Sequence, residues 1–543
     1  EWARYTDPSD EPDASVEKDM NTFIALTKDT HVEDLKPTMA LIKRIELLAI
    51  DVENVWSESL ATRNDIARSK SLQNLITLRE IIYEKIDIAT MKALAYSDEQ
   101  LDDRSELNIE ATAHRLSFGL WVSFADIRPM RRGIVFESLG IQFDLQKQVL
   151  QQHDNFVFRV IRMPIIAYNL QAYDIDPETI AIGDLLIFDI LFAPPPAYHL
   201  RQRKWTMRDT SNSATKLRKS VYPSSVPSRM VWKIPETVLM SDDMRVAVWS
   251  EEQKDWVEDS ISDYQYNEAT RSVTFYITTV GIIALVKKRT VDLPYKKWNL
   301  APVVYKPINA LIAAKLKVTD PSDLKAPTLV IVIDIAGPLC TLVKPVSPVF
   351  ADLLGEPMNP GTLLRRLLRK GVNLLPNAAD LAFADRVTFK NAVLEDNVLL
   401  QVAKAASAFE FTSSPWNQSL NDSQAGILIR ESNVYTCFPQ LNEYECILVE
   451  MDEISTSYKN TPELGFSPGP GGLRYLLVNG NEYGNRKVYS HVPRPNEIVH
   501  LEISKNLTKR ATMEALERMK NINQRFQKTV HTLLYLVKPL SLG

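Results

Sequence analysis

Apolar residues recur at three- and four-residue spacing through most of the first hundred positions, which predicts a helical amino-terminal region. The acidic segment up to Pro12 is expected to be extended. Asp13 or Ser15 is placed to cap a first helix that ends near Lys28. A second helix is predicted over residues 37–60, with proline in its first turn, where the missing N–H costs nothing.

The third helical segment is the longest. Residues 61–96 contain neither proline nor glycine, and a single apolar stripe follows them. The stripe consists of Leu75, Leu78, Ile82, Ile86, Ala89 and Ala93. A helix of roughly 35 residues would be about 50 Å long. Such a helix suits a partner-binding strut or a helix packed on its own domain, and the pattern leaves both interpretations open.

After about residue 108 the apolar period changes to that of strands. The first run is rich in Val, Ile, Phe and Trp and covers residues 115–124, 133–143 and 155–163. A second run of short strands covers residues 244–250, 255–262, 271–279 and 281–287. This spacing predicts an antiparallel sheet or sandwich, formed as one domain or two.

Beyond Pro302 helices and strands are mixed. Strands are predicted at residues 328–335, 425–430 and 445–451, and helices at 362–370, 399–409 and 508–536. Residues 461–495 are rich in Gly, Pro and Asn and predict a long loop with short strands.

The predicted fold class is therefore α+β multidomain, because 543 residues exceed the roughly 250–300 that one core supports. We expect a helical amino-terminal region over residues 1–108 that contains one long helix. A β-rich, antiparallel, sandwich-like region follows over residues 109–300, with a basic linker at 197–229. An α+β carboxy-terminal domain over residues 301–543 ends in a helix.

Charge adds one local feature. The chain carries 63 Lys and Arg against 68 Asp and Glu, a formal net charge of −5, which gives no general case for nucleic acid. Residues 201–219, however, contain seven cationic side chains and one acidic side chain, that of Asp209. These candidate partner-binding residues are Arg201, Arg203, Lys204, Arg208, Lys216, Arg218 and Lys219.

The residues between these cations are mainly Thr, Ser, Asn and Gln, with Trp205 as one aromatic. This composition predicts a mobile loop or linker rather than a strand. Its charge would attract an acidic surface such as tubulin, nucleic acid or an acidic protein. The alternative is a solvated linker that binds nothing.

A short basic amphipathic pattern occurs at residues 362–370, where four leucines face one side of a helix and four cations the other. Such a helix can bind membranes, but at this length we favour a surface helix packed on a core. No run of 18 apolar residues occurs, so we expect no membrane partner.

Candidate chemistry is sparse. Gly465–Gly469 fits the G-x-S-x-G hydrolase motif around Ser467, but the next residue, Pro468, has no N–H for an oxyanion hole. No phosphate-binding glycine motif is present. Three cysteines (Cys340, Cys437 and Cys446) and scattered histidines form neither a disulfide framework nor a zinc pattern. We expect a non-enzyme without cofactor or metal, in a reducing compartment.

Several segments, taken in order, resemble one family. Near the amino terminus these are Glu1–Tyr5, Asn21–Phe23 and Phe118–Val122. The middle of the chain contributes Val273–Phe275 with Gly281 and Leu285, Leu293–Trp298, and Leu374–Pro376. The carboxy-terminal part contributes Ala406–Phe411 with Trp416 and Asn417, then Phe526, Val530, His531, Leu533 and Leu534. Together they resemble the axonemal dynein accessory intermediate chain family of the cancer susceptibility candidate type, associated with the two-headed inner arm dynein f.

This resemblance implies a non-catalytic structural subunit of the ciliary or flagellar inner dynein arm. Its implied partners are tubulin of the doublet microtubule and the heavy and intermediate chains of the arm, in the axoneme, with a role in regulating ciliary beating and a cytoplasmic stage before assembly. A Lys/Glu-rich tail upstream of Glu1 is also implied. The alternative is a cytoplasmic assembly factor for axonemal dynein arms. The resemblance implies no residue-level binding site.

Overall fold

The chain forms two compact units in a computed structural model. The first comprises Glu1–Lys288 and Arg369–Gly371, and the second comprises Arg289–Leu368 and Val372–Gly543. The structure describes residues 12–62, 64–95, 97, 100, 106–123, 133–144, 156–165, 179–193, 198–200, 205–207, 219–220, 227–303, 313–319, 329–377, 380, 387–414, 417, 420–432, 445–451, 473–478 and 511–543. The domain boundaries expected from the sequence stay predictions.

Three helices open the first unit: α2 (Glu17–Asp29), α3 (Leu35–Thr62) and α4 (Asp65–Ala95). The third helix was predicted to begin at residue 61, but α3 continues to Thr62 and α4 begins only at Asp65. The side chain of Asn64 then accepts a hydrogen bond from the N–H of Ala67 at 3.1 Å, which satisfies a donor in the first turn of α4. A capping asparagine inside an apolar pattern therefore separates two helices.

The apolar stripe of α4 packs on its own unit. Leu75, Leu78, Ile82 and Ile86 are at most 2% exposed and belong to one core cluster with α3 and the neighbouring sheet. The helix is buried around much of its circumference, so it is a packed central element rather than an exposed strut.

Two antiparallel sheets complete the first unit. The central sheet has the strand order β1-β2-β5-β6-β15-β11-β12, with β9 paired to β6. Its strands are β1 (Glu106–Ala113), β2 (Leu116–Ser123), β5 (Phe156–Pro164), β6 (Thr179–Phe192), β9 (Lys219–Ser220), β11 (Arg245–Ser250), β12 (Asp255–Val257) and β15 (Ile282–Lys288). The outer sheet has the order β13-β14-β10-β4-β3. Its strands are β3 (Ile134–Phe136), β4 (Ile141–Asp144), β10 (Ser228–Lys233), β13 (Ile261–Asn267) and β14 (Ser272–Ile277).

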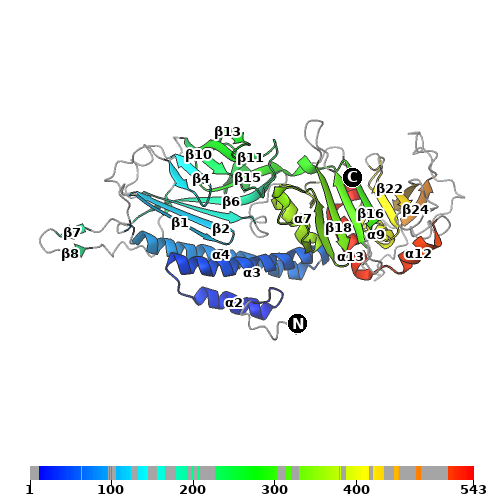
Figure 1. Ribbon diagram of the computed structural model, residues 1–543, viewed down its shortest axis with the longest axis horizontal. Coiled ribbons are helices and arrows are strands. Elements are labelled where there is room, and N and C mark those ends of the chain that lie inside the picture. The colour runs from blue at the N-terminus through cyan, green and yellow to red at the C-terminus, as the bar shows by residue number, and fades with distance from the viewer. Residues whose placement is uncertain are drawn as a thin grey trace. The chain divides into compact units, whose positions relative to one another are not determined.

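The central sheet is covered on both faces. Figure 1 shows α3 and α4 side by side along the sheet that contains β1, β2 and β6, with β4, β10 and β13 on its other side. All eight residues of β2 are buried. Phe118 and Leu120 face the helices, whereas the intervening Gly119 lies against the ring of Phe136 from the outer sheet. This double coverage explains why these strands are continuously apolar.

A buried ion-pair cluster ties α4 to the central sheet. Arg159 of β5 is 2% exposed, and its guanidinium lies 2.6 Å from Asp189 of the adjacent strand β6 and 2.6 Å from Asp87 of α4. It also donates to the hydroxyl of Thr90 at 3.2 Å. Removal of the arginine would break both of these ion pairs at the contact between helix and sheet, which is strongly destabilising.

A second buried group, Glu46, ties α3 to the turn between β1 and β2. Its carboxylate accepts backbone hydrogen bonds from Arg115 and Leu116, while Oε2 has no partner among the described groups. Burial raises the pKa of Glu46 to about 7, against the lowering effect of these bonds. The turn has only two residues, and His114 adopts a φ of 44° there.

The second unit is built on a nine-stranded antiparallel sheet of order β20-β19-β18-β17-β16-β21-β22-β23-β24. Its strands are β16 (Lys297–Val303), β17 (Ala313–Thr319), β18 (Val330–Ala336), β19 (Leu339–Lys344), β20 (Pro357–Met358), β21 (Phe409–Ser413), β22 (Gln424–Glu431), β23 (Glu445–Met451) and β24 (Leu473–Val478). Its helices are α7 (Pro360–Arg369, whose last residue groups with the first unit), α9 (Ala392–Ala405), α12 (Met513–Lys520), α13 (Gln524–Val537) and α14 (Pro539–Leu542).

The carboxy terminus is anchored beside strand β16. Tyr295 is 3% exposed; its hydroxyl donates to the carbonyl of Val537 at 3.0 Å, and its N–H donates to the carbonyl of Leu542 at 2.7 Å. Trp298, fully buried, contacts the terminal glycine, Gly543. Leu293–Trp298, a segment that carried part of the family resemblance, therefore holds the carboxy terminus of this unit.

The α+β multidomain fold class is confirmed, with corrections in detail. The predicted helix over 399–409 begins earlier, at Ala392, and ends at Ala405, since Phe409 starts strand β21. The predicted closing helix is interrupted after Lys520, because Asn523 caps a new helix by accepting from the N–H of Arg525 at 2.8 Å.

Two predictions about basic segments also change. Trp205–Met207 of the predicted basic loop forms strand β8, paired with β7 (Tyr198–Leu200). Helix α7 is not a surface helix, because Arg365 is buried along with its leucines. In the part of the chain that the structure describes, no helix is long and apolar enough to cross a membrane.

We predict that Gly119→Ala lowers the free energy of unfolding of the first unit by about 1–3 kcal/mol, because a Cβ there would lie 2.7 Å from Cδ1 of Phe136. Gly281→Ala is the matched control, since its Cβ would meet only Val248 Cγ1 at 3.8 Å, and it should change stability by about 0.5 kcal/mol or less. Urea unfolding monitored by tryptophan fluorescence measures both. Equal effects of the two substitutions would contradict this packing.

We further predict that Glu46→Gln stabilises the protein by about 1–3 kcal/mol at pH 8 and has little effect near pH 4.5. Between about pH 4.5 and 7 the folded state holds a proton on Glu46 that the unfolded state has released. The contribution of Glu46 to stability therefore falls as pH rises through this window, and glutamine removes that dependence. Urea unfolding at pH 5, 6, 7 and 8 tests this, and identical pH profiles for both proteins would rule it out.

Candidate binding groove

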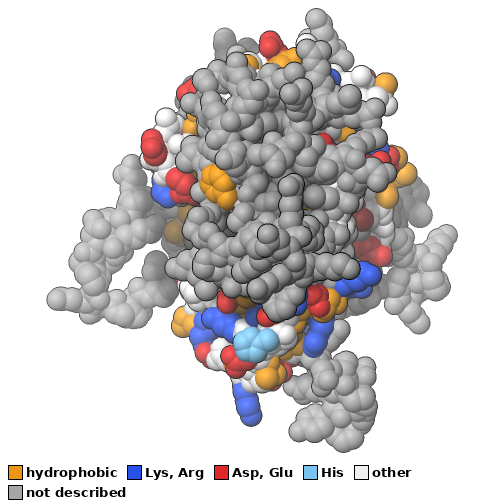
Figure 2. Space-filling view, turned by 90° about the vertical axis from the view of Figure 1, so that its left-hand side faces the viewer, with side chains coloured by type: hydrophobic (Ala, Val, Ile, Leu, Met, Phe, Trp, Pro, Cys, Tyr) orange, Lys and Arg blue, Asp and Glu red, His pale blue; other side chains and the backbone are white. Residues whose placement is uncertain are grey.

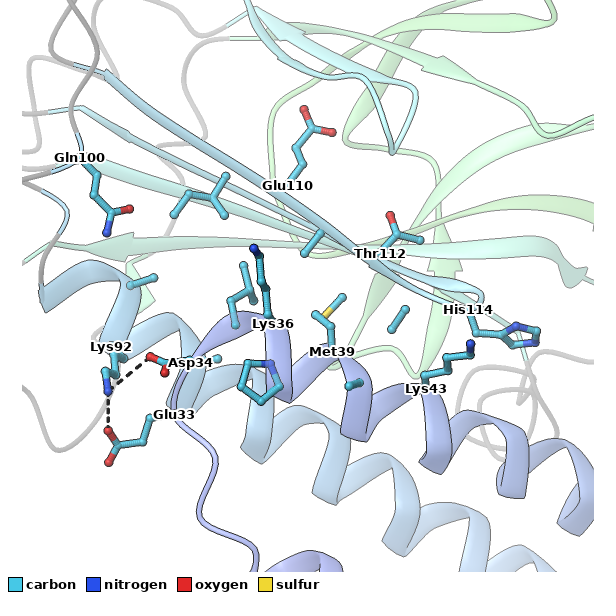
Figure 3. A pocket seen from close by; sticks show the side chains of 18 residues that line it. Glu33, Asp34, Lys36, Met39, Lys43, Lys92, Gln100, Glu110, Thr112 and His114 are labelled. Carbon is cyan, nitrogen blue, oxygen red and sulfur yellow. Dashed lines mark hydrogen bonds and ion pairs between the residues drawn. The ribbon is translucent and has the colours of Figure 1, made fainter. Parts of the chain in front are cut away.

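A groove of about 1170 Å³ lies in the first unit between α3, the end of α4 and strand β1. Figure 3 shows the side chains that line it. They come from the start of α3 (within residues 35–43), from the preceding loop (Glu33 and Asp34), from α4 (Ala89, Lys92 and Ala93), from Gln100 and from residues 109–114. The groove therefore lies between the helix pair and β1, an edge strand of the central sheet.

Small side chains make this region hollow. Ala40, Ala89, Ala93, Ala111 and Ala113 all line the groove. They occupy positions that face a neighbouring element, where larger residues would fill the gap. Met39 and Ile109 complete an apolar floor. This floor offers burial to an apolar side chain from another molecule.

One end of the groove carries a satisfied ion-pair cluster. The ammonium of Lys92 lies 3.0 Å from Glu33 and 3.4 Å from Asp34. Hydrogen bonds to Glu33 and then Asp34 raise the pKa of Lys92. Because two carboxylates share one ammonium, this end has no cation to spare for an incoming anion.

The other end is basic; we define this basic end as Lys43 and His114, and Figure 3 shows Lys36 between the two ends. None of the three forms a hydrogen bond or ion pair with a described residue. Lys36 and Lys43 are seven residues apart, so they share one face of α3. Desolvation, and then the charges of Arg115 and Lys43, lower the pKa of His114. A docked carboxylate would relieve this positive potential.

Strand β1 presents an open edge above the floor. It pairs with β2 alone among the described strands, and the turn between them closes at the pair Ala113–Leu116. In such a two-residue hairpin the closing pair exchanges both ladder bonds, so alternate residues turn their backbone N–H and C=O outward. These are Asn108, Glu110 and Thr112, and no described group bonds to their outward-facing backbone atoms.

The titratable groups of Glu110 and Cys340 are engaged, or are poorly suited to catalysis. The carboxylate of Glu110 is engaged with the N–H groups of Glu137 (3.1 Å) and Ser138 (2.8 Å), so it is not available as a base. Among the described residues, no group of three His, Cys, Asp or Glu is placed to hold a metal ion. The buried thiol of Cys340, in the second unit, has its pKa raised by burial, which makes it a poor nucleophile.

The partner-binding residues predicted from the sequence lie elsewhere. Of the seven basic positions, Lys219 is the first residue of β9, opposite Leu191 of β6. The other six, Arg201, Arg203, Lys204, Arg208, Lys216 and Arg218, lie outside the described residues. Ser467 of the disfavoured hydrolase motif also lies outside them. The structure therefore leaves the binding role of the basic stretch a prediction.

Sequence reasoning missed the groove. The one feature of the sequence that hints at the groove is the seven-residue spacing of Lys36 and Lys43, and such spacing occurs on many solvated helices. Charge on the face that Figure 2 shows gives little more. In Figure 2, Asp and Glu side chains are interspersed with Lys and Arg among the described atoms. We therefore expect any electrostatic recognition at the groove to be local and to depend on Lys43 and His114.

Comparison with known proteins gives consistent matches. The family model described as Cancer susceptibility candidate 1 N-terminus matches residues 1–130, which include all the residues that line the groove. A mouse protein named Dynein axonemal intermediate chain 7 is 24% identical over 412 residues, which is 73% of this chain and 50% of that protein. The human protein of that name is 26% identical over 270 residues, covering 47% of this chain and 35% of its own.

A zebrafish protein of the same name is 23% identical over 274 residues, covering 47% of this chain and 35% of its own. The matched parts thus span half or less of each of these relatives. The matches agree with the family named from the order of motifs along the chain. The chain is therefore similar to the axonemal dynein intermediate chains and to the amino-terminal family of the Cancer susceptibility candidate 1 type.

Proposed function

We propose that this chain is a non-catalytic structural subunit of the ciliary or flagellar inner dynein arm. In this role it links the intermediate and heavy chains of the arm to the doublet microtubule and so regulates ciliary beating. The observation that carries the proposal is the match to proteins named Dynein axonemal intermediate chain 7, which extends over 73% of this chain in the mouse protein.

The architecture of the described residues is compatible with this role. The first unit stacks a helix pair and two sheets through a continuous core, and buried ion pairs hold its layers together. Such a unit transmits force without local rearrangement, because a close-packed interior has low compressibility. Its accessible features are a groove and an open strand edge, which are the attributes of a protein that binds other chains.

We predict that the protein remains with axonemes after detergent removes the membrane and that high salt releases it together with inner-arm dynein. Immunoblots of detergent, low-salt and high-salt fractions from isolated cilia measure this. An outer-arm intermediate chain is the control for selective release. If the protein leaves with the detergent-soluble fraction, the alternative role of a cytoplasmic assembly factor replaces the proposal.

Attachment to the microtubule would use the basic stretch, since seven cations in 19 residues complement the acidic surface of tubulin. Contacts of this kind weaken as salt rises, because mobile ions screen them over about 8–10 Å.

We expect that replacing Arg201, Arg203, Lys204, Lys216, Arg218 and Lys219 with glutamine weakens microtubule binding and flattens its salt dependence. Cosedimentation of purified protein with microtubules between 25 and about 200 mM salt measures both effects. A variant with six lysines outside the stretch replaced is the control for net charge. Unchanged binding by the first variant would mean that the basic stretch is a solvated linker with no role in microtubule binding.

A further inference from the structure

We propose that the open edge of β1 and the adjoining groove bind an extended segment of a partner protein as an added strand. The segment would carry alternating apolar side chains and a carboxylate at the end that reaches Lys43 and His114. This inference does not depend on the dynein role, because it rests on the described residues of the first unit alone.

The open edge supplies the backbone recognition. Asn108, Glu110 and Thr112 offer outward N–H and C=O groups at a two-residue spacing, which is the repeat of a β-ladder. Asn108 and Thr112 are exposed, and Glu110 is partly so. A row of unpaired donors and acceptors of this kind is a template for strand addition. Main-chain hydrogen bonds would therefore contribute affinity that depends little on sequence.

The groove supplies the side-chain recognition. On β1, Ile109, Ala111 and Ala113 face the helices, and they alternate with the residues whose backbone faces outward. An added strand would direct every second side chain onto the same floor, beside Met39 and Ala40. Because the residues of this floor are mostly alanines, medium-sized apolar side chains fit there without displacing the core.

The charge arrangement selects one occupant over others. Glu33 and Asp34 repel an anion at one end, whereas Lys43 and His114 attract one at the other. Figure 3 shows Lys43 and His114 together at one end of the groove, and Lys92 with its two acidic partners at the opposite end. A segment with a carboxylate at one end therefore has a preferred orientation. A wholly basic segment has no favourable site at the basic end.

The test begins with selection of a displayed library of random 12-residue peptides on the full chain, followed by synthesis of the most enriched peptide. We expect enriched sequences to alternate apolar residues, to contain Asp or Glu, and to lack central proline. Ala111→Arg fills the groove, Lys43→Glu reverses the charge, and Thr112→Pro removes an outward N–H without breaking the β1–β2 ladder. Each should weaken binding of the synthetic peptide at least tenfold.

Arg44→Glu is the matched control, because it makes the same charge change at the next residue of α3, which does not line the groove. It should leave affinity within about twofold, since exposed charges contribute little at a distance. Circular dichroism and thermal melting confirm that each variant folds. If Thr112→Pro does not fold, hydrogen exchange of the wild-type protein decides, because strand addition must protect the amides of residues 108, 110 and 112.

Three results would overturn the proposal. The first is the absence of any enriched peptide. The second is an enriched peptide whose affinity is unchanged by Ala111→Arg and Lys43→Glu. The third is a peptide with helical three- and four-residue spacing that leaves the amides of β1 unprotected, which would mean that the groove accepts a helix instead.

Discussion

The first unit depends on burying both faces of one antiparallel sheet. Antiparallel sheets commonly leave one face in water, but here the helices α3 and α4 cover one face of the central sheet and the outer sheet covers the other. Two features make this stacking possible. Gly119 lets the ring of Phe136 approach the strand, and Arg159 places its charge between two carboxylates at the helix–sheet contact. The groove follows from the same constraint, since β1 extends to the edge of the layer where alanines leave space.

Many described residues of the segments that carried the family resemblance lie in the core, although Asn21 and Thr22 on α2 are exposed. Phe118 and Leu120 pack under the helices, Trp298 packs at the carboxy terminus, and Phe411 is fully buried in β21. Tyr295 holds the last helices through two hydrogen bonds. A resemblance of this kind identifies a shared fold, because it reports packing. It does not locate the residues that contact a partner, because surface positions vary more freely than the core.

Apolar periodicity predicted most elements, including the long helix, the β-rich middle and the closing helical segment, because burial imposes it directly. It failed where a polar residue begins a new helix within a segment that was predicted to be one continuous helix. Asn64 and Asn523 each cap a new helix, and neither break is visible from hydrophobicity. The groove was unpredictable for a different reason. Its floor joins residues near 40, 90 and 111, which only the tertiary fold brings together.

The proposed structural role in the inner dynein arm rests on the similarity to proteins named Dynein axonemal intermediate chain 7. The most direct test is electron cryotomography of cilia in which this chain bears a compact tag. The account predicts averaged density for the tag at the base of the two-headed inner arm, repeating with that arm along the doublet microtubule. A tag located at another axonemal complex, or absent from intact axonemes, would contradict it.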